Sequence, residues 1–174
     1  FVESLSPRER AGRAHWTMGQ VHFLRSFGNR TPYQHVSEPG QVHAVPFRLV
    51  DDKVIVQAKA NGSRLDFAVD TGSEQAVLSV RVARRLGVKP VSYTISAGVG
   101  QFGLRGLQLG RLDSFEVGTL KLRNVPVLIK SPVLPDTPTD DVESFSPLAV
   151  GLSAVIDYGT RKLVKENEAK LSDA

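Results

Sequence analysis

From about residue 42 onward, apolar and polar residues alternate with the period of two that is typical of β-strands. Val45, Phe47 and Leu49 share one face of the first predicted strand, because successive side chains in a strand face opposite sides. Asp51-Asp52 follows as a turn signal, and the apolar run over residues 54–56 predicts another strand. The main body of the chain therefore begins as strands joined by tight turns.

The alternation continues after Asn61-Gly62, a dipeptide that favours two-residue hairpins because both residues tolerate positive φ. Leu65, Phe67 and Val69 alternate up to Asp70. The pattern further predicts a short helix over residues 80–86, strands over residues 93–97, 104–109, 112–117, 120–122 and 125–129, a short helix within residues 145–152, and a final strand pair over residues 154–158 and 162–164. The expected fold class is all-β, built from hairpins.

The N-terminal part has a different pattern, which predicts a helix over residues 6–27. Ser6-Pro7-Arg8-Glu9 is a capping box with Pro at the first helical position. Two neighbouring apolar stripes follow at helical spacing: Ala11, Ala14, Met18 and Val21 form one, and Trp16, Phe23 and Phe27 form the other. We expect this helix to depend on docking to another surface, either covering a cleft or pairing two copies of the chain.

Composition supports a turn-rich β domain rather than a helical bundle. The 174 residues include 10 Pro and 15 Gly, and only 7% are aromatic. Because the chain has no Cys, disulfides, zinc–thiolate sites and cysteine nucleophiles are excluded. No apolar run approaches the ~18 residues that a membrane-spanning helix needs, so no membrane span is expected in this segment.

The net charge of +4 raises the question of a nucleic-acid partner. The basic residues are scattered and aromatic residues do not interleave with them, so we expect no nucleic-acid binding. His15, His22, His35 and His43 lack the accompanying carboxylate or cysteine spacing of a metal site. Neither a metal nor another cofactor is expected.

The most informative segment places an ionisable residue directly after an apolar strand. Phe67-Ala68-Val69 runs into Asp70-Thr71-Gly72-Ser73. Burial disfavours a charged carboxylate unless nearby donors hold it. Gly72 allows the backbone to bend so that its N–H faces the Asp70 carboxylate, and the Ser73 hydroxyl can donate to it as well. The segment therefore predicts a carboxylate oriented for chemistry.

The tetrad resembles the Asp-Thr-Gly-Ser/Ala signature of the retropepsin-like aspartic proteases, in particular bacterial exported proteins of that type. The likeness extends to the strands before Asp70, the helix after it and the closing strand, and covers roughly residues 42–164. It implies a single-lobe β-barrel with one or two short helices, preceded by the helical arm. The expected division is an N-terminal arm and linker over residues 1–41, a retropepsin-like protease domain over residues 42–165, and a polar tail over residues 166–174.

The resemblance implies an aspartic endopeptidase in which Asp70, Thr71, Gly72 and Ser73 form the catalytic loop and a peptide or protein is the substrate. The family needs two facing aspartates that share a proton and activate water. One candidate for the second is Asp157, where Val155-Ile156-Asp157 loosely echoes the first motif, although Asp157 can equally well only end a strand. The other is Asp70 of a second copy, since a twofold dimer brings identical loops face to face. The homodimer is the favoured expectation, and the resemblance also implies a periplasmic or otherwise extracytoplasmic location.

A glycine-rich stretch between two predicted strands admits three interpretations. By resemblance it is a flexible flap that closes over the bound peptide, comprising Ala97, Gly98, Val99, Gly100, Gln101, Phe102 and Gly103. The same residues formally match a dinucleotide-binding fingerprint, but the residues that follow alternate like a strand rather than opening a helix. A glycine-rich turn without a ligand is the third interpretation.

One departure from the family bears on activity. Family members carry an apolar-apolar-Gly triplet that backs the catalytic loop, and counting back from Ser153 places it at Val142-Glu143-Ser144. Leu148-Ala149-Val150-Gly151 has the matching chemistry, but it leaves too few residues for the helix that the family has before Ala154. The first alignment has two consequences. A serine would replace the close-packing glycine, and Glu143 would bring a buried charge. The alternative function is therefore a catalytically impaired, protease-like peptide-binding or regulatory module.

Overall fold

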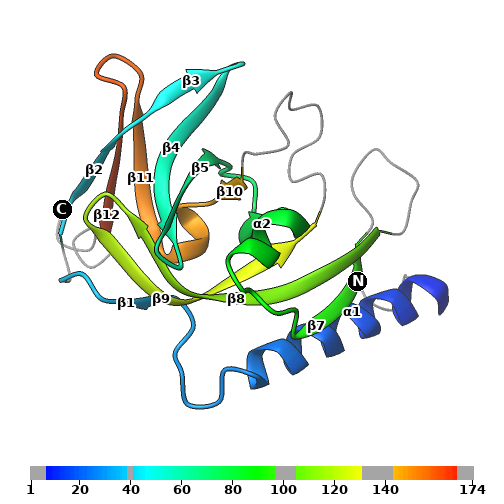
Figure 1. Ribbon diagram of the computed structural model, residues 1–174. Helices are drawn as coiled ribbons and strands as arrows, with labels where there is room; N and C mark the ends of the chain where they lie inside the picture. The colour runs from blue at the N-terminus through cyan, green and yellow to red at the C-terminus, as the bar shows by residue number, and fades with distance from the viewer. Residues whose placement is uncertain (1–6, 39–40, 97–104, 131–142, 168–174) are drawn as a thin grey trace, which may run out of the picture.

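The structure of the protein is a computed structural model that describes residues 7–38, 41–96, 105–130 and 143–167. Strands dominate it, with one long and one short helix (Figure 1). The elements in chain order are α1 (Pro7–Arg25), β1 (Gln34–His35), β2 (His43–Pro46), β3 (Arg48–Val50), β4 (Lys53–Ala60), β5 (Ser63–Val69), β6 (Ala76–Leu78), α2 (Val80–Arg85), β7 (Ser92–Ser96), β8 (Arg105–Val117), β9 (Leu120–Ile129), β10 (Glu143–Phe145), the 3-10 turn η1 (Leu148–Val150), β11 (Leu152–Asp157) and β12 (Lys162–Asn167).

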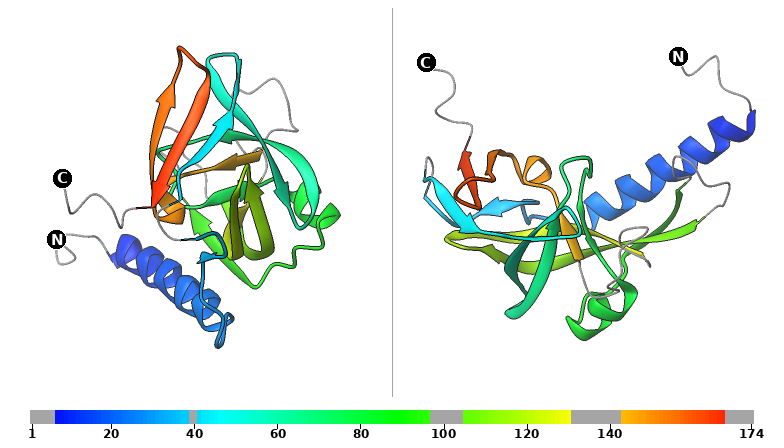
Figure 2. Two further views of the ribbon diagram at one scale, coloured as in Figure 1. Left: turned by 90° about the vertical axis from the view of Figure 1, so that its left-hand side faces the viewer. Right: turned by 90° about the horizontal axis from the view of Figure 1, so that it is seen from above.

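Six strands close into a barrel (Figures 1 and 2). Around it, β9 pairs with β6, β6 with β10, β10 with β5, β5 with β4, β4 with β8, and β8 returns to β9. The β6–β9 and β10–β5 contacts are parallel, whereas the other four are antiparallel. The predicted all-β barrel is therefore confirmed.

The remaining strands extend this barrel at its margins. β3 pairs with β4, β7 with β8, and the short β1 with β9. β11, β12 and β2 form a separate antiparallel sheet in that order, so the strand before the barrel and the last strand of the described chain lie side by side.

The two predicted tight turns are confirmed, and their backbone angles give the reason. Asp51 and Asp52 have φ values of 47° and 60°, and Asn61 and Gly62 have 45° and 81°. Positive φ at both central residues twists a two-residue turn in the sense that matches the strands on either side. The β4–β5 hairpin thereby pairs Ala60 with Ser63, which sets the register of the strand that leads to Asp70.

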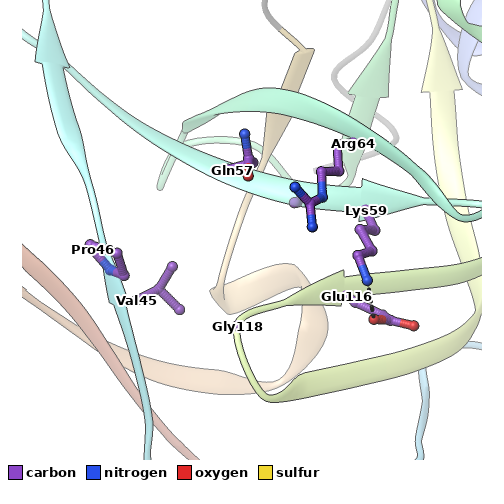
Figure 3. A pocket seen from close by; sticks show the side chains of 8 residues that line it. Val45, Pro46, Gln57, Lys59, Arg64, Glu116 and Gly118 are labelled. Atoms are coloured by element: carbon purple, nitrogen blue, oxygen red, sulfur yellow. Dashed lines mark ion pairs between the residues drawn. The ribbon is translucent and has the colours of Figure 1, made fainter.

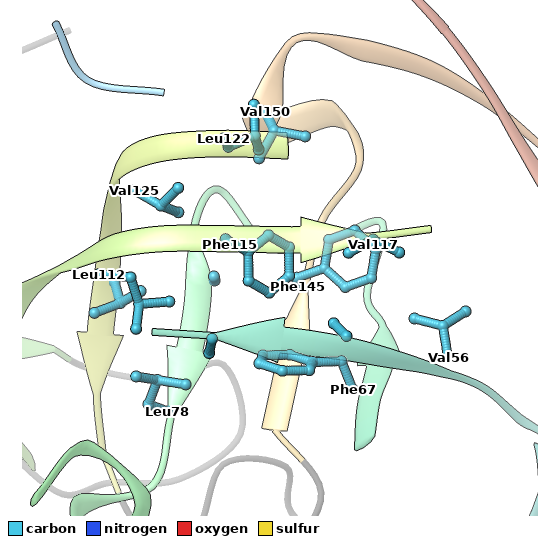
Figure 4. Close-up of a cluster of buried hydrophobic side chains, with 14 of the residues drawn as sticks. Val56, Phe67, Leu78, Leu112, Phe115, Val117, Leu122, Val125, Phe145 and Val150 are labelled. Carbon is cyan, nitrogen blue, oxygen red and sulfur yellow. The ribbon is translucent and has the colours of Figure 1, made fainter. Parts of the chain in front are cut away.

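The hairpin of β4 and β5 separates a polar outer face from an apolar inner one. Gln57 and Lys59 are exposed on the outside (Figure 3), whereas the alternate positions point into the barrel. Inside, the rings of Phe67, Phe115 and Phe145 contact one another, with centroids 5.2 Å apart for Phe67–Phe115, 5.5 Å for Phe115–Phe145 and 6.3 Å for Phe67–Phe145 (Figure 4). These aromatic contacts join β5, β8 and β10 in one core.

Helix α1 lies along the outside of the barrel (Figure 2), where it packs against β7. Phe23 and Phe27 are almost fully buried there against Leu109 of β8. The other predicted apolar stripe faces solvent in the part of it that the structure describes, since 68% of the Met18 side chain is exposed and Val21 is also exposed. Within the described residues, no helix has the length and apolar character needed to cross a membrane.

Three predicted boundaries are wrong. The predicted strands over residues 104–109 and 112–117 are one long strand, β8, which is described from Arg105 onward, and residues 120–122 and 125–129 belong to another, β9. The two strands pair with each other from Gln108–Ile129 to Val117–Leu120, on both sides of Asp113 and Asn124, and this pairing carries them across the polar positions that interrupt the apolar pattern. The helix expected within residues 145–152 is instead the end of β10 followed by the single turn η1, because Phe145 pairs with Val69 in the barrel.

Candidate active site

Asp70 lies directly beyond the end of β5, where the strand leaves the barrel. Its backbone N–H donates to the Phe145 carbonyl at 3.0 Å, which extends the parallel β5–β10 ladder by one more bond. Val69 pairs with Phe145 in the same ladder. The position of Asp70 is therefore determined by β5 before it and by β10 beside it.

The loop after Asp70 folds back on its carboxylate. The Gly72 N–H donates to Asp70 Oδ1 at 3.0 Å, as the sequence predicts. The Ser73 hydroxyl does not serve the carboxylate, contrary to expectation: it donates to the Gln75 carbonyl at 2.6 Å and accepts from the Gln75 N–H at 3.4 Å. Ser73 therefore shapes the turn that leads into β6, while Gly72 orients the acid.

The candidate catalytic loop faces outward. Thr71 and Gly72 are exposed, and Asp70 is half-buried. A surface hollow of about 350 Å³ is lined by Thr71–Glu74 of this loop together with Leu148 and Ala149 of η1. Leu148 is 61% exposed, so an apolar side chain faces solvent beside the acid. The sequence indicated this segment only as the alternative position, Leu148-Ala149-Val150-Gly151, of the triplet that backs the catalytic loop, and Leu148 and Ala149 of η1 line the hollow at that loop.

The strand that backs the loop is β10, Glu143–Phe145, which lies one residue further along the chain than the expected triplet; Val142 lies outside the described residues. Glu143, Ser144 and Phe145 are fully buried, and they pair in parallel with Phe67, Ala68 and Val69. The expected disturbance of this support is absent from the backbone, since the ladder continues to Asp70. The Phe145 side chain, the last of β10, packs in the barrel core against Phe67 and Phe115.

The carboxylate of Glu143 is held by Ser79, immediately before α2. It accepts the Ser79 N–H at 2.5 Å and the Ser79 hydroxyl at 3.0 Å. Ser79 Oγ also accepts the Val82 N–H at 3.2 Å and so caps α2. Burial raises the pKa of Glu143, while the two bonds from Ser79 and the charges of Arg81 and Arg85 act to lower it.

Ser144 differs from its neighbour. Its hydroxyl is buried and finds no hydrogen-bond partner among the described residues. A buried hydroxyl without a partner costs free energy, so β10 carries one satisfied and one unsatisfied polar side chain in an otherwise apolar barrel wall.

Asp157, the alternative second acid, is engaged in its own turn. Its carboxylate accepts the Gly159 N–H at 2.9 Å, the Thr160 N–H at 3.0 Å and the Thr160 hydroxyl at 2.6 Å. The hydrogen bonds from Thr160 lower the pKa of Asp157. Asp157 ends β11 in the separate sheet, whereas Asp70 follows β5 in the barrel.

The predicted flap residues 97–103 lie outside the described residues. On either side of them, β7 and β8 form an antiparallel pair that ends with Ser96 opposite Arg105. Among the residues that the structure describes, no three His, Asp or Glu side chains group closely enough to hold a metal ion. The imidazole of His35 instead contacts the Val150 carbonyl at 3.0 Å, and that of His43 contacts the Thr119 hydroxyl at 2.7 Å.

Comparison with known proteins agrees with this geometry. Residues 56–142 match a family described as aspartyl protease. A retropepsin-like aspartic protease from Rickettsia conorii has a similar structure, with a TM-score of 0.53 and 19% identity over 78% of this chain and 96% of that one. The retroviral protease-like domain of Ddi1 from Leishmania major gives a TM-score of 0.42 and 18% identity over 66% and 92% of the two chains. No curated protein matches the sequence. The likeness to the Rickettsia structure shows that the barrel has the retropepsin-like fold.

Proposed function

The chain belongs to the aspartyl protease family, and from that premise we propose that it is an endopeptidase whose active site forms between two copies, each supplying Asp70. The observation that carries the proposal is the Asp70 loop: a half-buried carboxylate, bonded to the Gly72 N–H, behind an exposed Thr71. A loop in this position can present the Asp70 carboxylate to a second copy of the chain or to a bound peptide.

Paired acids are needed because a single carboxylate cannot both accept and supply the protons of peptide hydrolysis. Two carboxylates in contact do not both ionise, so one stays protonated. The ionised Asp70 takes a proton from a water molecule, and the oxygen of that water bonds to the scissile carbonyl carbon. The protonated Asp70 gives its proton to the carbonyl oxygen. The Asp70 that took the proton from water then gives it to the amide nitrogen as the C–N bond breaks. One hydroxyl of the intermediate returns its proton to the other Asp70 as the carboxylic acid forms.

Two observations support the second copy as the source of the other acid. Asp157 already accepts three hydrogen bonds within its own turn and belongs to a different sheet. Thr71, Gly72 and the apolar Leu148 are exposed together around the hollow beside Asp70. A twofold contact at this surface would bring Asp70 to Asp70 and cover Leu148.

The first experiment measures cleavage of a peptide library from about pH 3 to about pH 8, a range that brackets carboxylate titration. Asp70→Asn should abolish cleavage and leave the fold intact by circular dichroism. Asp157→Asn is the matched control and should cleave like the wild type. Equal cleavage by the Asp70 variant would refute the assignment.

The second experiment measures the mass in solution by sedimentation. We expect a dimer under the conditions that support cleavage, and dilution to the monomer should remove activity in proportion to the dimer lost. Full activity of a monomer would refute the shared site. The extracytoplasmic location implied by the resemblance belongs to the same proposal and can be tested by fractionating the source cells.

A protease-like peptide-binding module without chemistry is the second candidate, and the polar residues of β10 favour it. Ser144 is buried without a partner among the described residues, in the strand that supports Asp70. This candidate predicts peptide binding without turnover, and binding that Asp70→Asn does not change. The peptide library separates the two functions directly.

A further inference from the structure

The outer face of the β4–β5 hairpin carries an ordered set of charges, away from the Asp70 loop. The register places Lys59 opposite Arg64 and Gln57 opposite Asp66. Two of these side chains are neutralised: Asp66 pairs with Arg48 of β3 at 2.7 Å, and Lys59 pairs with Glu116 of β8 at 3.8 Å. Arg64 lies between these ion pairs.

Arg64 has no carboxylate of its own. Within the part of the chain that the structure describes, no acidic oxygen lies within 4.0 Å of its guanidinium. Figure 3 shows the Arg64 side chain beside those of Gln57 and Lys59. It is an exposed cation whose nearest carboxylates are already occupied.

Helix α2 adds two more cations to the same place. Arg81 and Arg85 are four residues apart and therefore lie on one face of the helix. With residues of the hairpin they line a hollow of about 350 Å³, whose walls are Gln57, Arg64, Leu65, Asp66, Arg81 and Arg85. A second hollow of about 330 Å³ shares Gln57 and Arg64 and continues toward Val45 and Gly118 (Figure 3).

Asp66 is the one carboxylate in the lining of the first hollow, and it is taken by Arg48. Like Arg64, Arg85 has no acidic partner within 4.0 Å among the described residues. Guanidinium groups present planar pairs of donors that match the oxygens of phosphate. Arg64 and Arg85 at one hollow suit a single group of two negative charges better than a lone carboxylate, and the Gln57 amide adds an uncharged donor.

We propose that the hollow between the β4–β5 hairpin and α2, lined by Arg64, Arg81 and Arg85, binds a phosphate group. The phosphate is either free or carried on a small molecule or side chain, because the hollow is open to solvent on one side. This site is separate from the Asp70 loop and does not depend on the protein being an active protease.

The test titrates the full chain with inorganic phosphate while backbone amide shifts are followed by NMR, at constant ionic strength. We expect saturable binding with a dissociation constant of about 1 mM or tighter and shifts centred on Arg64 and α2. Phosphoserine titrated in the same way distinguishes the sources: binding as tight as phosphate or tighter indicates a carried group, and weaker binding indicates the free ion. A rise in melting temperature with phosphate concentration is the second readout.

The variant Arg64→Gln/Arg85→Gln should weaken phosphate binding at least about tenfold. Its charge-matched control is Lys121→Gln/Arg123→Gln, which removes two exposed cations from β9 and should bind phosphate like the wild type. Equal weakening in both doubles would show a general charge effect and overturn the site. Shifts that stay linear with phosphate, or that acetate reproduces at the same ionic strength, would overturn it as well.

Discussion

Replacing Glu143 tests whether a buried carboxylate in β10 is part of the support for the active loop. Glu143 is 0% exposed, and both of its oxygens accept hydrogen bonds from Ser79. Glu143→Ala would leave the Ser79 N–H without an acceptor, at about 1–3 kcal/mol, and would remove a buried methylene, at about 0.8 kcal/mol. We expect a loss of about 2–4 kcal/mol in the free energy of unfolding at about pH 7.

Glu143→Gln separates the shape of the side chain from its charge. The amide oxygen can still accept the Ser79 N–H, and the amide N–H₂ can donate to Ser79 Oγ. Stability at about pH 7 should therefore remain within about 1 kcal/mol of the wild type. The pH dependence should change, because the glutamine does not titrate.

The sign of that change follows from the direction of the pKa shift. Burial raises the pKa of Glu143 above its ordinary value of 4.5, so the folded protein binds this proton more tightly than the unfolded chain does. The stability that Glu143 contributes is fully present below about pH 4.5 and is lost as the pH rises through the folded pKa. The wild type should gain stability relative to Glu143→Gln as the pH falls toward 4.5.

Urea unfolding of both proteins at a series of pH values measures this difference directly. A difference that stays constant over the range would show that Glu143 has an ordinary pKa and is not desolvated. A wild type that loses stability relative to Glu143→Gln as the pH falls would show that the hydrogen bonds from Ser79 outweigh burial, and that the reasoning is wrong.

Three other changes have defined outcomes. Gly118→Ala should lower the melting temperature, at a cost of about 1–3 kcal/mol, because φ is +60° and the new Cβ would lie 2.8 Å from Cγ2 of Val45; unchanged melting would contradict the geometry. Phe27→Ala should cost about 3 kcal/mol and expose α1 to limited proteolysis, because Phe27 is 2% exposed, whereas Met18→Ala should do neither. In Asp157→Asn, the free energy of unfolding should fall less steeply than in the wild type as the pH becomes acid. Hydrogen bonds lower the pKa of Asp157, so the stability that this carboxylate contributes is present above its ordinary pKa of 3.8 and is lost as the pH falls through the folded pKa. A urea series between about pH 2 and about pH 5 checks this, and identical slopes for both proteins would refute it.

Local chemistry determined the turns, the short helix and the loop at Asp70. The two hairpin turns depend on residues that tolerate positive φ, and the structure has them at Asp51-Asp52 and Asn61-Gly62. The Gly72 N–H reaches the Asp70 carboxylate two residues away. These features involve atoms that are close in the chain, so residue types alone were enough to predict them.

Tertiary structure decided the rest, because residues distant in the chain compete for the same partners. The Ser73 hydroxyl serves the Gln75 carbonyl rather than Asp70, and α1 buries Phe23 while leaving Met18 exposed, since Leu109 lies under one stripe only. The partner of Glu143 is Ser79, 64 positions away, and no periodicity in the sequence pairs the two. Barrel closure brings β10 alongside β5 and so supplies the wall behind Asp70, because that pairing joins segments that no local pattern connects.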